Sequence, residues 1–180
     1  MQRDTVWIID GAYLLKAAPG KFDFMKLKRE IERECGAALS GTYYLNSVST
    51  EPYDAQDAFH DWLQMAPPHG PNMHVQLYGL KSMRIKCPNC GGTFDRTVQK
   101  GVDVGIATLI LKLAAQNRYE RLVLAAGDGD LADAVSYVKD DLHKEFWLCG
   151  YHDTISGDLQ GYADRVLWLD DRWDAIKRIA

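Results

Sequence analysis

Residues 5–10 are Thr-Val-Trp-Ile-Ile-Asp, a nearly continuous apolar run that ends in an aspartate and is followed by Gly11. An apolar run without polar alternation is typical of a strand that is buried on both faces. Strands of this kind belong to parallel sheets, which helices cover on both sides. We therefore predict a buried strand here that opens into a turn at Gly11.

Helical and strand-like segments alternate along the rest of the chain. Phe24, Leu27 and Ile31 recur at helical spacing between Asp23, a suitable N-cap, and Gly36, a suitable helix-ending glycine. Similar patterns predict further helices from Ala55 to the prolines at 67 and 68, over 102–116, over 131–140, before Asp164 and at the end of the chain. Further strands are predicted at 41–48, 73–77, 121–126, 145–150 and 165–169. This alternation predicts a doubly wound α/β fold with a mostly parallel sheet and helices on both faces.

Length, composition and charge are those of one ordinary globular domain, residues 1–180. The chain is 47% hydrophobic and 26% charged, which excludes a disordered or collagen-like protein. A net charge of −4 excludes a protein that coats nucleic acid by overall basic charge, so any such contact must be local. No apolar run reaches the roughly 20 residues of a membrane span, and the first residues lack the pattern of a secretory signal. We therefore expect a cytoplasmic protein.

Aspartates follow the predicted strands at the edge where open α/β sheets bind their ligands. Asp10 ends the first strand, Asp128 and Asp130 follow the strand at 121–126, and Asp103 lies in the first turn of a helix. Neighbouring strands would bring these carboxylates together, and such a cluster repels itself unless a cation is present. Carboxylate oxygens favour Mg²⁺ or Mn²⁺, held largely through water. The alternative is that each aspartate only caps a helix.

Three blocks of sequence resemble a known family. They are Ile8-Ile9-Asp10-Gly11, Lys100-Gly101-Val102-Asp103-Val104 and Ala126-Gly127-Asp128-Gly129-Asp130. In order and spacing they resemble the signature blocks of NYN domains, the LabA-like branch of the PIN-like nuclease superfamily. The resemblance spans essentially the whole chain, including Asp164-Arg165-Val166 before the last strand, and it implies a PIN-like fold.

The resemblance also implies an activity, that of a metal-dependent endoribonuclease cleaving RNA phosphodiester bonds with metal-activated water. Asp10, Asp103 and Asp128 would be catalytic ligands of Mg²⁺ or Mn²⁺, and Asp130 a further catalytic residue that is either a ligand or supports one. Such an ion lowers the pKa of its bound water, which attacks phosphorus in line. RNA is the expected partner in preference to DNA, and a flap-nuclease-like or phosphatase-like activity is the alternative for this kind of cluster.

Two positions depart from the family pattern. The first block usually continues Asp-Gly-x-Asn, whereas this chain has Tyr13 in the place of the asparagine. An aspartate is common six residues after Asp103, where this chain has Leu109. A water or the Tyr13 phenol can replace the first missing group, but Leu109 can coordinate nothing. The alternative function is therefore a catalytically degenerate module that binds RNA or regulates.

Cys87 and Cys90 belong to the turn Cys-Pro-Asn-Cys-Gly-Gly, in which two thiolates can bind one Zn²⁺ ion. A closed structural zinc site needs four ligands, so the turn is half a site. His69 or His74, Cys149, or the same turn in a second chain could complete it, the last making a homodimer. The other interpretations are a reduced turn without a metal and, less favoured, a redox pair.

The segment 81–100 around this turn is predicted to be a basic hairpin insertion that faces the substrate. Its cationic residues, opposed only by Asp95, are Lys81, Arg84, Lys86, Arg96 and Lys100. We expect them to contact RNA phosphates, while Tyr78, Phe94 or Tyr13 offers a face for base stacking. The alternative is a solvated hairpin whose charges only protect a strand edge.

Overall fold

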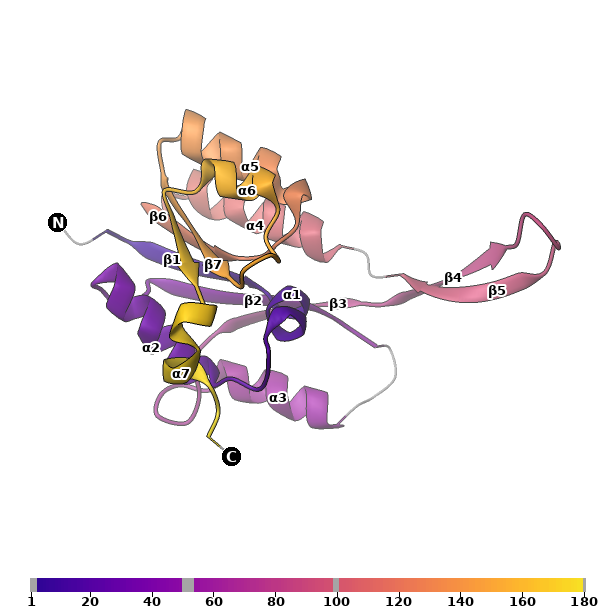
Figure 1. Cartoon of the computed structure of the whole chain (residues 1–180), viewed down its shortest axis with the longest axis horizontal. Helices are drawn as coiled ribbons and strands as arrows, with labels where there is room; N and C mark the ends of the chain where they lie inside the picture. Colours follow the sequence, from indigo (N-terminus) through magenta and orange to yellow (C-terminus); the bar gives the residue numbers. More distant parts are fainter. Residues whose placement is uncertain (1–2, 50–53, 99–100, 180) are drawn as a thin grey trace.

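The central feature of the computed structural model, which describes residues 3–49, 54–98 and 101–179, is a parallel sheet (Figure 1). Its six strands run in the order β3-β2-β1-β6-β7-β8. They are β1 (Thr5–Asp10), β2 (Gly41–Val48), β3 (His74–Gly79), β6 (Arg121–Ala125), β7 (Glu145–Gly150) and β8 (Arg165–Trp168). Each lies where the hydrophobic pattern predicts a strand, to within two residues. The predicted α/β fold is therefore confirmed.

Helices cover both faces of this sheet (Figure 1). One face carries α4 (Val102–Ala115), α5 (Ala132–Ser136) and α6 (Gly157–Tyr162). The other face carries α1 (Gly11–Ala17), α2 (Phe24–Cys35), α3 (Asp54–Gln64) and α7 (Trp173–Ile176). Among the described residues, no helix combines the length and the apolar character that crossing a membrane demands.

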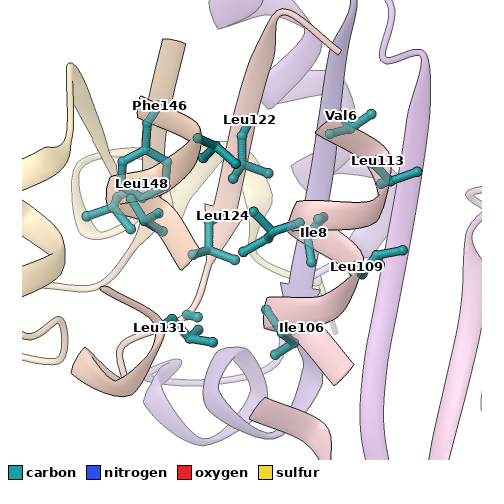
Figure 2. Close-up of a cluster of buried hydrophobic side chains, with 14 of the residues drawn as sticks. Val6, Ile8, Ile106, Leu109, Leu113, Leu122, Leu124, Leu131, Phe146 and Leu148 are labelled. Atoms are coloured by element: carbon teal, nitrogen blue, oxygen red, sulfur yellow. The ribbon is translucent and has the colours of Figure 1, made fainter. Parts of the chain in front are cut away.

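The two layers explain why β1 is apolar at successive positions. Val6 and Ile8 belong to the core under α4, whereas Trp7 and Ile9 belong to the core on the opposite face. Figure 2 shows the first of these cores, in which side chains from the sheet meet those of α4. Because successive side chains of a strand point to opposite faces, a strand between two cores must be apolar throughout.

The ends of α2 follow the predicted capping chemistry. Oδ1 of Asp23 accepts hydrogen bonds from the backbone N–H groups of Met25 and Lys26, at 2.8 and 3.1 Å. Gly36 adopts a left-handed conformation with φ of 69°, which lets the chain leave the helix. Both predicted ends of the helix are confirmed.

Helix α1 is the main element that the sequence pattern does not predict. It begins immediately after β1 at Gly11, which is a poor helix former, and it has only 7 residues. Its N-cap is Asp10, whose side chain satisfies the first turn of the helix. The helix predicted over 131–140 also differs from the structure. It divides into the 3₁₀ turn η1 (Gly129–Leu131), α5 and the π-helical segment η2 (Tyr137–Asp141). A further 3₁₀ turn, η3 (Asp170–Arg172), precedes α7.

A two-stranded antiparallel hairpin extends away from the sheet and its helices (Figure 1). It consists of β4 (Lys81–Lys86) and β5 (Thr93–Val98), and we call residues 81–98 the arm. In the sheet assignments of the described residues, these strands pair only with each other. The hairpin expected within 81–100 is therefore present, and it is inserted between β3 and α4.

Candidate active site

The carboxyl ends of β1 and β6 form the switch point of the sheet. The chain adds β2 and β3 on one side of β1 and later adds β6, β7 and β8 on the other, so the strand order reverses between β1 and β6. Ligands of open α/β sheets bind at such a switch point. Ile9 pairs with Ala125, so Asp10 and the residues leading to Asp128 continue from adjacent strand ends. These two aspartates therefore lie at and just beyond the carboxyl ends of two adjacent strands.

Asp10 is nearly buried and is the N-cap of α1. The residue is 8% exposed, and its Oδ1 accepts a hydrogen bond of 3.1 Å from the backbone N–H of Tyr13. Burial raises the pKa of the Asp10 carboxyl above its usual range, against the lowering effect of the Tyr13 N–H, and the charges of Asp103 and Asp128 raise this pKa further. Like charges around a buried carboxylate favour the binding of a cation.

Asp103, Asp128 and Asp130 are exposed to solvent. Asp103 lies in the first turn of α4, after Gly101, which begins the helix without a side-chain cap. Partial burial raises the pKa of Asp103, and the charges of Asp128 and Asp130 raise it as well. The four predicted aspartates, Asp10 included, are thus close enough to act on one another electrostatically.

Asp10 and Asp128 both cap helical turns, as the structural alternative predicts. Oδ1 of Asp128 accepts a hydrogen bond of 3.0 Å from the backbone N–H of Asp130 at the start of η1. A capping bond orients a carboxylate and leaves it charged. Capping and cation binding are therefore compatible at both residues.

The donor set suits a hard divalent cation that is held mainly through water. In the described part of the chain, no three His, Cys, Asp or Glu side chains lie close enough together to hold an ion directly. Mg²⁺ usually keeps several waters and uses only one or two carboxylates, so it does not require such a group. The carboxylates around Asp10 and Asp103 would supply the oxygen ligands and the negative charge for this mode of binding.

Tyr13 does not offer its phenol to the carboxylates. Oγ1 of Thr154 donates its proton to the carbonyl oxygen of Tyr151 at 2.7 Å, so the 2.7 Å contact between Tyr13 and Thr154 has the phenol as donor. The phenol oxygen accepts a further hydrogen bond of 3.4 Å from the backbone N–H of Tyr151. The phenol is committed to the loop after β7, and it does not replace the asparagine of the family pattern.

The ring of Tyr13 lies against two glycines at the ends of neighbouring strands. A Cβ atom on Gly127 would lie 2.7 Å from a ring carbon, and one on Gly150 would lie 2.2 Å from the phenol oxygen. Both distances are far below van der Waals contact. The glycines therefore make room for the ring over the ends of β6 and β7.

Leu109 is part of the core, as its apolar side chain requires. It is 7% exposed and belongs to the cluster under α4 that Figure 2 shows. Its surroundings are apolar, in keeping with a side chain that has no ligand atom. A ligand at the family's second aspartate position in α4 is absent from this chain.

The structure also brings Ser156 and Asp158 to this edge, which the sequence analysis did not include. A Cβ atom on Gly129 would lie 3.2 Å from Oγ of Ser156 and 3.4 Å from Oδ2 of Asp158. Ser156 is the N-cap of α6, and its Oγ accepts a hydrogen bond of 3.3 Å from the N–H of Leu159. Both residues follow the predicted strand at 145–150, with Asp158 in the first turn of α6, but their approach to Gly129 depends on the tertiary structure.

The basic residues predicted to contact RNA lie along the arm where the structure describes them. Arg84, Lys86 and Arg96 are exposed. Arg84 forms an exposed ion pair of 3.3 Å with Asp95 across the two strands. The side chain of Lys81 and the whole of Lys100 lie outside the described residues.

Tyr78 connects the base of the arm to the helix that carries Asp103. A Cβ atom on Gly105 would lie 2.1 Å from the Tyr78 phenol oxygen, and one on Gly101 would lie 3.2 Å from its ring. The half-buried ring therefore packs on the first turns of α4. Phe94, in contrast, is 53% exposed on the arm.

Cys87 and Cys90 lie at the tip of the arm, in the turn between β4 and β5. Cys149 is completely buried in β7, and His74 stacks on Tyr43 at the first residue of β3, 4.9 Å between ring centroids. The described residues contain no group of three metal-ligating side chains, which excludes His69, His74 or Cys149 as the third ligand in this chain. These three proposed completions of a zinc site are therefore wrong.

Comparisons with known proteins agree with this fold. The family model described as NYN domain matches residues 5–170. A similar solved structure is that of VPA0982, a protein of unknown function from Vibrio parahaemolyticus RIMD 2210633, with a TM-score of 0.67, 20% identity, and coverage of 94% of this chain and 95% of that one. At this identity the likeness establishes the fold alone. The search of curated proteins found no match.

Proposed function

The chain belongs to the NYN domain family, within the PIN-like nuclease superfamily, and from this premise we propose that it is a divalent-metal-dependent endoribonuclease. The observation that carries the proposal is the concentration of carboxylates at the switch point of the sheet. Asp10, Asp103 and Asp128 come from three separate parts of the chain, yet the charges of the other two raise the pKa of the buried Asp10. A site that gathers like charges in this way is suited to a cation and to a phosphate ester bridged by it.

Asp10, Asp103 and Asp128 are the residues that would hold Mg²⁺ or Mn²⁺, with Asp130 beside them. When bound, the ion would supply an activated water and neutralise charge on the phosphate. Asp10 is fixed in orientation by its hydrogen bond to the Tyr13 N–H. Asp103 and Asp130 are exposed, so a substrate can reach them from solvent.

The arm would hold the rest of the RNA. Arg84, Lys86 and Arg96 provide exposed positive charge in a protein whose net charge is −4. Contacts to phosphates position a nucleic acid without selecting its sequence. The arm would thus bind the RNA while the aspartates hold the metal ion. The contact of Tyr78 with the first turns of α4 supports these two roles, because it joins the arm to the helix of Asp103.

The test is cleavage of labelled single-stranded and hairpin RNA with Mn²⁺, Mg²⁺ or EDTA, with matched DNA as a competitor. We expect metal-dependent cleavage of RNA that Asp128→Asn abolishes, since asparagine keeps the capping bond but loses the charge. Asp61→Asn is the control, because Asp61 is an exposed carboxylate on α3, on the other face of the sheet. Full activity in Asp128→Asn would overturn the proposal, and preferential cleavage of DNA would change its substrate.

A second candidate function is RNA binding without catalysis. The observations that favour it are the commitment of the Tyr13 phenol to Thr154 and the apolar surroundings of Leu109, which leave two family positions without a ligand. This function predicts RNA binding that is insensitive to EDTA, with no cleavage under any divalent ion. Metal-dependent turnover that is lost in Asp128→Asn would exclude it.

A further inference from the structure

The turn at the tip of the arm directs backbone N–H groups at one sulfur atom. The N–H of Cys87 donates to the carbonyl of Gly92 at 2.7 Å, and the N–H of Gly91 donates to the carbonyl of Cys87 at 2.9 Å, which closes the turn. The backbone N–H groups of Cys90 and Asn89 donate to the sulfur of Cys87. The turn therefore holds this sulfur in place at the tip of the arm, and cysteine sulfur is a common metal ligand.

One face of the arm, which we call its apolar face, carries three apolar side chains beside Arg96, and the turn continues it. Ile85 is paired with Phe94, and Met83 is paired with Arg96. Directly paired residues of an antiparallel hairpin share a face, so these four side chains lie together. Phe94 is 53% exposed and Met83 is 43% exposed. Cys87 follows Ile85 by two residues and continues the pairing with Gly92, so it falls on the same face.

The opposite face of the arm is polar. Its cross-strand pairs are Ser82 with Thr97, Arg84 with Asp95 and Lys86 with Thr93. The two faces therefore differ in chemistry, although both are solvent-facing in the described structure. An isolated two-stranded hairpin is marginally stable in water, and an apolar face open to solvent makes it less so.

The cysteine pair supplies only half of a closed metal site. Tetrahedral structural zinc takes four ligands, and thiolate sulfurs are among those it prefers. Cys149 is buried in β7, and no third His, Cys, Asp or Glu joins Cys87 and Cys90 within the described ranges. A complete zinc site would take the missing pair from another molecule, and an identical turn related by a twofold axis provides two matching thiolates.

We propose that two copies of this chain pack the apolar faces of their arms together and share one zinc ion, which Cys87 and Cys90 of each copy bind. The same contact covers Met83, Ile85 and Phe94 and lies beside Arg96. Arg84 and Lys86, on the open polar faces, are then the cations of the arm that remain free to hold RNA. The proposal does not depend on the nuclease activity, because it uses none of the aspartates at the switch point.

The first experiment measures zinc content and molecular mass of protein purified without chelator. We expect about half a zinc ion per chain, as a site shared by two chains requires, and a dimer by light scattering. The double substitution Cys87→Ser and Cys90→Ser should remove the zinc and give a monomer. Cys35→Ser is the control, because Cys35 is a half-buried thiol at the end of α2 and should change neither quantity.

The second experiment separates the apolar contact from the ligands. Phe94→Lys leaves all four sulfurs in place and should weaken dimerisation about tenfold or more, because it removes the aromatic side chain that the proposed contact would bury. Thr97→Lys adds the same charge to the polar face and should leave the dimer unchanged. Equal weakening of dimerisation by both variants would overturn the proposal that the apolar face of the arm forms the contact.

Three results of the first experiment would overturn the shared site. They are one zinc ion per monomeric chain, folded protein that binds no zinc when the ion is added, and a dimer that persists in the double serine variant. Circular dichroism of each variant establishes that the sheet has folded. Asp128→Asn should keep both the zinc and the dimer, so that failure of the nuclease proposal is distinguished from failure of this one.

Discussion

The hydroxyl group of Tyr13 donates a hydrogen bond of 2.7 Å to Oγ1 of Thr154, and this bond ties helix α1 to the loop that follows β7. The same ring lies over the ends of two strands, against Gly127 and Gly150. Tyr13 therefore holds together the elements that surround the switch point. In this way Tyr13 contributes to the site by positioning these elements. The family pattern has an asparagine at this position.

Tyr13→Phe should lower the free energy of unfolding by about 1–2 kcal/mol, because it removes the hydrogen bonds of the phenol with Thr154 and Tyr151 and leaves the ring in place. Cleavage of RNA should persist, since the phenol faces Thr154 and the loop. Urea denaturation and the cleavage assay measure the two effects. Abolished cleavage in a stable Tyr13→Phe protein would show that the phenol takes part in the chemistry.

Gly127→Ala should destabilise the protein by roughly 1–3 kcal/mol, the usual cost of overpacking. Its Cβ atom would lie 2.3 Å from the carbonyl oxygen of Thr154 and 2.7 Å from the ring of Tyr13. Gly161→Ala is the control, because nothing lies within 4 Å of its added Cβ atom in α6. That substitution should be neutral or stabilising by up to about 1 kcal/mol. Equal unfolding midpoints in urea for the two variants would contradict this description of the site.

Asp128→Ala and Asp128→Asn should separate the two roles of this residue. Both should abolish cleavage, because both remove the charge. Only the alanine variant should also lose about 1 kcal/mol of stability, since asparagine still accepts the hydrogen bond from the Asp130 N–H. Thermal denaturation of both variants, beside the cleavage assay, tests the distinction, and equal stabilities would remove the capping role.

The pH dependence of the free energy of unfolding should reveal that the charged form of Asp10 is unfavourable in the folded protein. Its pKa is raised in the folded protein by burial and by its neighbours, so its favourable contribution is complete below the unfolded pKa near 3.8 and is lost as the pH rises through the folded pKa. Relative to Asp10→Asn, the wild-type protein should therefore become less stable as the pH rises above about 4 in EDTA. Urea midpoints across this range measure the difference.

Mg²⁺ provides the complementary measurement. It should restore wild-type stability at neutral pH and should affect Asp10→Asn less, because a ligand that binds only the folded state stabilises it. Parallel curves of urea midpoint against pH for the two proteins would show that the charged form of Asp10 is not unfavourable in the folded protein. An equal response of both to Mg²⁺ would remove Asp10 from the ligands.

Salt dependence should identify the arm as an RNA-binding surface. Lys86→Ala should weaken RNA binding and reduce the slope of log affinity against log salt by about one, as loss of one phosphate contact does. Arg118→Ala is the control, because Arg118 is exposed between α4 and β6, near the amino end of that strand. Identical slopes for both variants would place the RNA elsewhere.

The sequence predicts the sheet well because burial on both faces leaves a direct trace in composition. Val6 and Trp7 are adjacent in sequence and enter opposite cores, so the whole run must be apolar. Helix α1 leaves no such trace, since it is short and its cap is Asp10, a residue with a second candidate role. Local pattern identifies a strand or a long amphipathic helix more readily than a helix of two turns.

The candidate site was only partly accessible from sequence. Asp10, Asp103, Asp128 and Asp130 follow strands or open helices, and strand order then brings them near one another. The position of Asp158 depends on how the loop after β7 folds back toward η1, which no spacing reveals. The hydrogen bond from Tyr13 spans 141 positions of sequence, so only the tertiary structure could identify its partner.

The arm begins after β3 and returns to α4, and its strands pair only with each other in the described sheets. The register of the parallel sheet is therefore independent of what the arm contains. A segment arranged in this way can gain, lose or exchange residues without changing the pairing of the sheet. Tyr78 is the exception, because it packs at Gly105 on the helix of Asp103. Changes in the rest of the arm can thus alter what the arm contacts while the sheet and its aspartates keep their positions.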